Sequence, residues 1–325
     1  TADEINELLH SQGGLVRIKG QWIAAEPEKI AALIEQWREA EQLAQSEGLS
    51  LMAGLRLLAG AELPSDQKSL SIDQDYCSFE ASGELQDLLK DLRNPGDIQL
   101  PELPDNLENI LRPYQFDGVK YLWRTSSLGL GTCLADDMGL GKTLQMLTLI
   151  KLWKQSGKLQ KMPVLLVLPA TLLANWKNES AKFTPGLKLG MLHASGMESK
   201  DWTDFEEKPE AYLKQFDIVL TTYGMLPRLP ILAKLKFPAV IADEAQAIKN
   251  PHAKQSRALR KLNADQRIAL TGTPVENRLT DLWSIFDFVN PGLLGTLKNF
   301  QDFSKTLNND YKPLRKLTQP FILRR

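Results

Sequence analysis

The sequence predicts a doubly wound α/β fold with a mainly parallel sheet over its larger, carboxyl-terminal part. From about Leu111 onward, short apolar runs alternate with longer helical patterns. Several runs, such as Val164–Leu168, are continuously apolar, which is typical of parallel strands buried on both faces. The helical patterns between them supply the crossover connections that a parallel sheet needs. The predicted strands cover residues 132–135, 164–168, 187–192, 218–221, 239–242 and 267–270.

The amino-terminal part has a different texture and predicts a small mixed α+β region. Alternation within Leu15–Ile23 indicates a β-hairpin, and the apolar spacing within Ile30–Trp37 indicates an amphipathic helix. Three prolines and a glycine between Asn94 and Pro104 predict a linker. Further helices are expected over residues 50–58 and 83–92, an accessory domain over 1–100 and a second domain over 101–325.

Composition and charge exclude several classes of protein. Hydrophobic residues make up 43% and charged residues 24%, ordinary values for a soluble globular chain. The apolar runs are too short to cross a bilayer, and no secretion signal precedes them, so we expect a cytoplasmic protein without a membrane partner. The cysteines and histidines lack metal-ligand spacing. Because the net charge is −1, any contact with nucleic acid must be local.

The stretch Leu134–Thr143, LADDMGLGKT, nearly matches a phosphate-binding loop. Glycines let such a loop turn tightly, Lys142 would reach the β- and γ-phosphates, and the Thr143 hydroxyl would ligate Mg²⁺. Asp136 stands where the usual pattern has glycine. A carboxylate is tolerable there only if it points away from the phosphates or pairs with a cation, and we expect it to face away. An ordinary glycine-rich turn between strand and helix explains the stretch equally well. The predicted nucleotide-binding residues near this turn are Met138, Gly139, Leu140, Gly141, Lys142, Thr143 and Leu144.

A second motif, Val240–Gln246, is an apolar strand that ends in adjacent carboxylates. Strand ends of this kind lie in the crevice where open α/β sheets bind ligands. Asp243 would hold Mg²⁺, and Glu244 would orient and polarise the attacking water. The alternative is a solvated acidic helix start. A lysine-bearing loop about a hundred residues upstream, with strands between, favours the catalytic interpretation, with Lys142, Asp243 and Glu244 as its catalytic residues.

Taken in order, the motifs resemble one family closely. From about Asn109 to Arg325 the chain is similar to the first RecA-like lobe of Swi/Snf-type ATP-dependent DNA translocases, within superfamily 2 helicases. In that family an acidic residue replaces the first glycine of the loop, so Asp136 conforms to it. The DEAQ form of the acidic motif is similar to prokaryotic members, which implies a nucleoid-associated protein. The matching segments are Leu111–Gln115, Asp136–Thr143, Val167–Ala170 with Asn175, Trp176 and Glu179, Asp217–Gly224, Asp243–Gln246, Leu270–Asn277 and Pro320–Arg325.

The resemblance implies ATP and Mg²⁺ as cofactors, an adenine contact by Gln115 and a backbone contact with double-stranded DNA. It also assigns Gln246 and Arg278 to a relay between two lobes, whereas Trp176 is expected to serve packing. A strand end and turn would explain Thr221–Tyr223 as well, and Lys249 could be a solvated lysine. The implied DNA contacts are Ala170, Thr171, Thr221, Thr222, Tyr223, Lys249, Thr271 and Gly272.

The function predicted in this way is that of the amino-terminal part of an ATP-dependent duplex DNA translocase or remodeller. The chain begins without methionine and ends on Arg324-Arg325, so we expect a fragment. In the family a second RecA-like lobe supplies the arginines that complete the ATPase site, so the fragment alone should hydrolyse ATP negligibly. Two alternatives stay open: a strand-separating helicase and a non-catalytic scaffold. Whether residues 1–94 repress the motor or dock a protein partner is also open.

Overall fold

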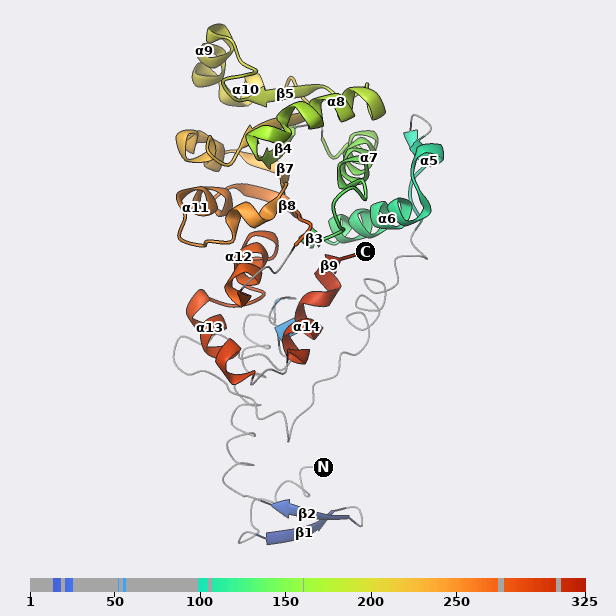
Figure 1. Cartoon of the computed structure of the whole chain (residues 1–325), viewed down its shortest axis with the longest axis vertical. Coiled ribbons are helices and arrows are strands. Elements are labelled where there is room, and N and C mark those ends of the chain that lie inside the picture. Colours follow the sequence, from blue (N-terminus) through green and yellow to red (C-terminus); the bar gives the residue numbers. More distant parts are fainter. Residues whose placement is uncertain are drawn as a thin grey trace. The chain divides into compact units, whose positions relative to one another are not determined.

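The computed structural model describes residues 14–18, 21–25, 52, 55, 56, 99–104, 107–159, 161–273, 278–307 and 311–325 (Figure 1). Its internal contacts divide the chain into two compact units. One consists of Thr1–Ala81 with Asn309–Pro313, and the other of Ser82–Asn308 with Leu314–Arg325. The division predicted at residue 100 stays a prediction.

In the first unit, strands β1 (Gly14–Ile18) and β2 (Gln21–Ala25) pair antiparallel, which confirms the predicted hairpin. Of the helix predicted over residues 50–58, positions 52, 55 and 56 are described, and they are helical. The helices predicted over 30–37 and 83–92, and the first half of the predicted linker, lie outside the described residues.

The second unit contains a seven-stranded sheet in the order β5-β6-β4-β7-β8-β3-β9. Every neighbouring pair in it is parallel, so the predicted α/β class is confirmed. The six predicted strands are present, and β9 is an addition too short to produce a pattern. The strands are β3 (Thr132–Leu134), β4 (Val164–Leu168), β5 (Leu189–Leu192), β6 (Ile218–Thr222), β7 (Lys236–Ala242), β8 (Asn263–Leu270) and β9 (Ile322–Leu323).

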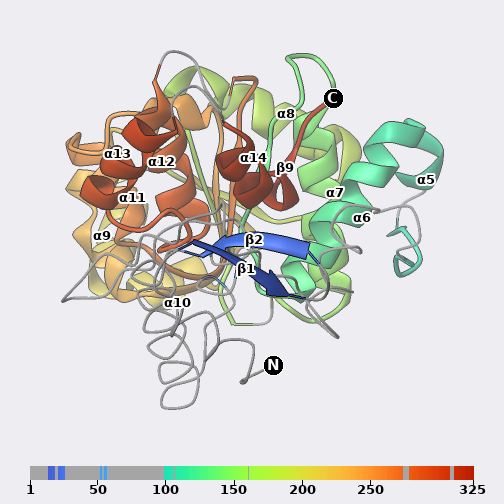
Figure 2. The same ribbon diagram turned by 90° about the horizontal axis from the view of Figure 1, so that it is seen from below.

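Helices cover both faces of this sheet. Helices α6, α7 and α8 lie on one face and α11 and α12 on the other (Figures 1 and 2). The α-helices are α5 (Leu107–Ile110), α6 (Pro113–Ser127), α7 (Lys142–Gln155), α8 (Leu173–Phe183), α9 (Ser199–Glu207), α10 (Pro209–Leu213), α11 (Lys254–Arg260), α12 (Leu279–Val289), α13 (Leu297–Thr306) and α14 (Lys312–Thr318). The short 3₁₀ helices used below are η3 (Ala170–Leu172) and η6 (Ala245–Ile248). Among the described helices, none combines the length and hydropathy that a membrane span needs.

The strands are buried on both sides, which explains their continuously apolar sequences. Leu166 and Ile241 belong to the cluster that joins the sheet to α6, α7 and α8. Leu165 and Val240, one position earlier in each strand, are equally buried but point to the opposite face. Each strand therefore presents apolar side chains to both helical layers. The carboxyl ends of β7, β8 and β3 lie side by side, since these strands are parallel neighbours in the sheet.

Candidate functional site at the carboxyl edge of the sheet

The phosphate-loop candidate connects β3 to α7. Gly139 and Gly141 adopt left-handed backbone conformations, with φ of 83° and 76°, which other residues adopt only under strain. Gly141 is the N-cap of α7 and carries no side chain to cap it, so the first N–H groups of the helix point into the loop. The Lys142 ammonium donates to the carbonyl oxygens of Asp136 (2.7 Å) and Asp137 (3.2 Å). The loop thus has the backbone of a phosphate cradle.

Asp136 faces the interior, as the sequence analysis expected. Its side chain is 0% exposed. One carboxylate oxygen, Oδ2, accepts a hydrogen bond from Gln145 Nε2 at 3.2 Å. The other, Oδ1, lies 3.8 Å from Nε of Arg325. Its charge is therefore directed at a protein cation behind the loop.

Gln115 ties the start of α6 to the same loop. Its Oε1 accepts from the backbone N–H of Arg112 at 2.9 Å, and its Nε2 donates to the carbonyl oxygen of Leu140 at 3.0 Å. A Cβ at Gly141 would lie 2.2 Å from that nitrogen, so glycine is required there for close approach as well as for φ. The structure thus shows Gln115 supporting the loop, and its contact with adenine stays a prediction.

Asp243 follows β7 and is held from several directions. Its Oδ2 accepts from the indole N–H of Trp176 at 2.7 Å, and its Oδ1 accepts from the backbone N–H of Glu244 at 2.9 Å. The hydroxyl of Tyr223 donates to the Asp243 carbonyl oxygen at 2.7 Å. Burial raises the pKa of the Asp243 carboxyl; the Trp176 bond and the nearby Lys142 charge act in the opposite direction. Trp176 therefore orients this carboxylate, a role that the sequence analysis did not assign because tryptophan in a helix mostly signals core packing.

Glu244 has the one positive φ among the described non-glycine residues, 49°. Such a conformation costs about 1–3 kcal/mol and is frequent at functional sites. The Glu244 Oε2 accepts from the Gln246 amide at 2.5 Å, and Gln246 Oε1 accepts from the Thr271 hydroxyl at 2.9 Å. The Thr271 hydroxyl also accepts from the backbone N–H of Thr273 at 3.1 Å. These bonds form a continuous relay from the end of β7 to the end of β8.

The residue chemistry fits a magnesium ion bound together with phosphates. Thr143 and Asp243 offer a hydroxyl and a carboxylate, which are hard oxygen donors of the kind Mg²⁺ prefers. Each carboxylate oxygen of Asp243 accepts a single hydrogen bond from the described residues and so keeps a lone pair for a ligand. Over the described part of the chain, no cluster of three or more His, Cys, Asp or Glu side chains could bind a metal without phosphate.

The predicted DNA contacts divide into an exposed and a buried set. Ala170, Thr171 and Lys249 are exposed. Thr221 and Tyr223 are buried, and their hydroxyls donate to the carbonyl oxygens of Leu192 and Asp243. Thr222, Thr271 and Gly272 are buried as well. The hydroxyls of Thr221, Tyr223 and Thr271 thus donate to internal acceptors in this structure, and the DNA contacts of the buried set stay predictions.

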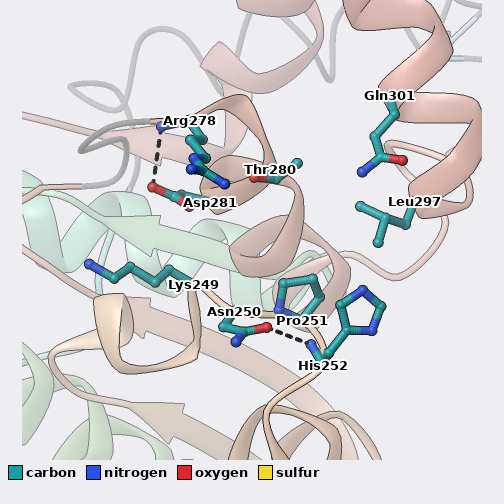
Figure 3. Close-up of a pocket in the computed structure, with 9 residues that line it drawn as sticks. All are labelled: Lys249, Asn250, Pro251, His252, Arg278, Thr280, Asp281, Leu297 and Gln301. Atoms are coloured by element: carbon teal, nitrogen blue, oxygen red, sulfur yellow. Dashed lines mark hydrogen bonds between the residues drawn. The ribbon is translucent and has the colours of Figure 1, made fainter.

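Lys249 also borders a hollow of about 420 Å³. Figure 3 shows it between the segment Lys249–His252 and the starts of α12 and α13. Arg278 lies on its far side, with its backbone N–H directed at Asp281 Oδ2, 3.4 Å away. The hollow therefore brings together two cationic residues that the sequence analysis had placed in different roles.

Comparisons with known proteins agree with this geometry. A family model described as "SNF2-related domain" matches residues 114–325, and one described as "SNF2 Helicase protein" matches residues 1–59. A Bacillus subtilis protein named ATP-dependent helicase/translocase YwqA is 37% identical over all of this chain, which covers 35% of that protein. The TATA-binding protein-associated factor mot1 of Schizosaccharomyces pombe is 34% identical over 66% of the chain and 11% of its own length.

Among solved structures, the Sulfolobus solfataricus SWI2/SNF2 ATPase core in complex with dsDNA superimposes with a TM-score of 0.60. The two are 39% identical, and the match covers 70% of this chain and 47% of the Sulfolobus chain. The matches thus cover 35% of the Bacillus protein, 11% of mot1 and 47% of the Sulfolobus chain, so this chain spans less than half the length of each.

Proposed function

Because the chain belongs to the family of SNF2-related domains, we propose that it is the first RecA-like lobe of an ATP-driven duplex DNA translocase. The observation that carries the proposal is the meeting of two motifs at one edge of the sheet. The loop with Lys142 and the strand end with Asp243 and Glu244 lie there, close enough for the Lys142 charge to lower the pKa of Asp243. The Bacillus relative, named a helicase/translocase, supports the same assignment.

In this proposal the side chains divide the work of phosphoryl transfer. Lys142 leaves the loop carbonyls and binds the β- and γ-phosphates, while the N–H groups at the start of α7 bind the remaining phosphate oxygens. Thr143 and Asp243 would hold the Mg²⁺ ion, which would supply positive charge beside the phosphates. Glu244 orients the attacking water. Gln246 links the Glu244 carboxylate to the Thr271 hydroxyl through its two hydrogen bonds, so that a movement of Glu244 displaces Thr271.

Duplex DNA is the proposed track. The Sulfolobus neighbour, whose structure includes dsDNA, supports this, as do the exposed Ala170, Thr171 and Lys249. These residues offer backbone and charge contacts, which position a protein on phosphates without reading sequence. Since the chain has a net charge of −1, few phosphates can be engaged. Binding by this chain should therefore be weak, independent of sequence and strongly salt-dependent.

Hydrolysis is proposed to need a second RecA-like lobe. An arginine supplied across such a cleft raises phosphoryl-transfer rates about 10³–10⁵-fold, and the family resemblance places such arginines on the second lobe. Residues 1–100 are proposed as an accessory domain that docks a protein partner or restrains the motor. A cytoplasmic, nucleoid-associated location is proposed as well, because the DEAQ form of the acidic motif is similar to prokaryotic members.

The test has two parts. The 325-residue chain should bind a fluorescent ATP analogue with Mg²⁺, and Lys142→Ala should weaken that binding by at least about tenfold, since a charge-assisted contact contributes about 1.5–3 kcal/mol. A longer protein with both lobes should release phosphate faster when duplex DNA is added, without separating its strands. Strand displacement would favour a helicase instead. Normal hydrolysis by a Glu244→Gln protein would overturn the catalytic assignment.

A further inference from the structure

The end of the described chain lies directly behind the phosphate loop. Strand β9 pairs parallel with β3, so that Leu134 is opposite Leu323. The pairing continues into the loop, because the backbone N–H of Ala135 donates to the Leu323 carbonyl at 2.7 Å. The backbone N–H of Asp137 donates to the Arg325 carbonyl at 3.3 Å. The first residues of the loop are thus positioned by residues almost two hundred positions later in the chain.

The Arg325 side chain extends this contact. Its Nε lies 3.8 Å from Asp136 Oδ1, and its guanidinium stands 5.7 Å from the centre of the Tyr114 ring. Within the described residues, no hydrogen-bond partner reaches Arg325 Nη1 or Nη2, Asp136 Oδ1 or Gln145 Oε1, although all four atoms are buried. Buried polar atoms without partners are costly and uncommon in native structures. Several buried donors and acceptors around Asp136 therefore lack a hydrogen-bond partner.

Helix α6 has a glycine, Gly118, where the side chains of Gln145 and Arg325 pack against it. A Cβ at Gly118 would lie 1.9 Å from Gln145 Oε1 and 2.9 Å from Arg325 Nη2. Since real Cβ atoms do not approach so closely, glycine at this position makes room for both side chains. Three elements, α6, α7 and the segment after β9, therefore converge on the one buried carboxylate of the loop.

From this geometry we infer that Arg325 is a positioning residue of the phosphate loop, which holds Asp136 as its counter-ion and links nucleotide binding to the segment after β9. The inference rests on the nucleotide binding proposed above. In the structure the Lys142 ammonium holds the loop by donating hydrogen bonds to the carbonyl oxygens of Asp136 and Asp137. When phosphates draw the ammonium away, the loop depends on its bonds to residues 323–325. A small shift then closes the pair of Asp136 and Arg325 to about 2.7–2.9 Å, the usual length of a charge-assisted bond.

The inference predicts a specific pattern of nucleotide affinities. Arg325→Gln leaves a buried carboxylate without its counter-ion, and removing one partner of such a pair is strongly destabilising. The affinity of the 325-residue chain for a fluorescent ADP analogue, with Mg²⁺, should therefore fall about tenfold or more. Adding Asp136→Asn to Arg325→Gln removes the uncompensated charge, so the double variant should recover to within about threefold of the wild type. Arg324→Gln is the matched control, because Arg324 is the exposed neighbour, and it should change nothing.

Thermal unfolding separates this role from a purely structural one. If Arg325 only stabilised the fold, Arg325→Gln would lower the melting temperature and leave the affinity of the folded chain unchanged, which would overturn the inference. Should Arg325→Gln not fold, Arg325→Lys decides, since it keeps the positive charge that Asp136 needs. A folded Arg325→Lys chain that lost nucleotide affinity about tenfold or more would also overturn the inference. A wild-type chain that binds no nucleotide would overturn the proposed function together with it.

Discussion

The phosphate loop and the strand end at Asp243 both place a carboxylate away from water, but they compensate its charge in different ways. Both bury a carboxylate at the carboxyl edge of the sheet, Asp136 at 0% and Asp243 at 6% exposure. Each carboxylate also accepts a hydrogen bond from a neutral side chain, Gln145 in one case and Trp176 in the other. Asp136 also has a cationic side chain, that of Arg325, as its ion-pair partner, and among the described residues Asp243 has none.

The difference indicates which carboxylate is available to a ligand. Asp136 is compensated by the protein, so it can sit beside a phosphate cradle without repelling the phosphates. Asp243 is desolvated, and its pKa is raised by burial, so it gains most from a cation that comes from outside the chain. The comparison therefore predicts that substitutions at Asp243 act through the metal, whereas those at Asp136 act through the shape of the loop.

The largest effect is expected from Asp243→Asn. The amide keeps the shape but loses the charge that would ligate Mg²⁺, so Mg²⁺-dependent nucleotide affinity should fall by more than the ~10–100-fold that loss of an outer-shell partner costs. Nucleotide binding in EDTA should stay unchanged. Isothermal titration with and without Mg²⁺ measures both quantities. Equal losses in the two buffers would mean that Asp243 shapes the loop rather than holding the metal.

A smaller effect is expected from Trp176→Phe, which removes the indole N–H and keeps most of the packing. A hydrogen bond to a charged group contributes about 1.5–3 kcal/mol, and loss of an outer-shell partner lowers metal affinity ~10–100-fold. The control is Trp153→Phe, because Trp153 is buried in the same core cluster as Trp176 but its indole N–H donates to the Ser126 hydroxyl instead of Asp243. Mg²⁺ titrations that gave the same affinity for both variants would assign Trp176 to the core alone.

The pH dependence follows from the raised pKa of Asp243. Burial raises this pKa above its unfolded value. The charged Asp243 therefore lowers the free energy of unfolding at neutral pH, and this loss disappears as pH falls through the folded-state pKa. Mg²⁺ needs the charged form. Stabilisation by Mg²⁺ and nucleotide should therefore disappear on acidification at a higher pH than an ordinary aspartate would give. Trp176→Phe should raise that midpoint further, because its bond lowers the pKa. Melting curves across the acid range, with Asp243→Asn as the flat reference, test this.

A still smaller effect is expected from Thr271→Val in the relay. The valine keeps the volume of this buried residue but removes the hydroxyl that donates to Gln246. A hydrogen bond of about 1 kcal/mol corresponds to roughly a fivefold change, which should appear in DNA-stimulated phosphate release by a two-lobe protein and not in nucleotide affinity. Thr271→Ser should behave as wild type. A fivefold loss in affinity instead would place Thr271 in the binding site.

The sequence predicted the fold and the two motifs well because both rest on strong local signals. Two-sided burial produces the continuous apolar strands, and a lysine-bearing glycine loop has few structural alternatives once a strand ends in Asp243-Glu244. The inward turn of Asp136 was also predicted, since a carboxylate beside phosphates must be directed elsewhere. Its partner Arg325 was not predicted, because nothing local indicates a contact across almost two hundred residues.

Polar contacts between residues far apart in the chain could not be predicted from the sequence. The bond between Trp176 and Asp243 joins residues 67 positions apart, with β5, β6 and β7 between them. Tryptophan in a helix is also more often a core residue. The strand β9 has two residues, too few for any pattern. For Thr221 and Tyr223 the residue types were correctly taken as polar groups at a strand end, but the direction of their hydroxyls depends on which buried carbonyls need a donor.

The smallest effect is expected from Tyr223→Phe, and it decides between the two roles of that residue. Because the hydroxyl donates to the Asp243 carbonyl, its loss should cost about 1 kcal/mol and lower the melting temperature by ~2–4 °C. Affinity for duplex DNA should stay within about twofold, with an unchanged salt dependence. Lys249→Gln, at an exposed position, should instead reduce the slope of log affinity against log salt by about 0.9. If Tyr223→Phe weakened DNA binding as much as Lys249→Gln does, the Tyr223 hydroxyl would have to leave the Asp243 carbonyl when DNA binds. The residues proposed to hold the metal ion and those proposed to contact DNA would then not be separate sets.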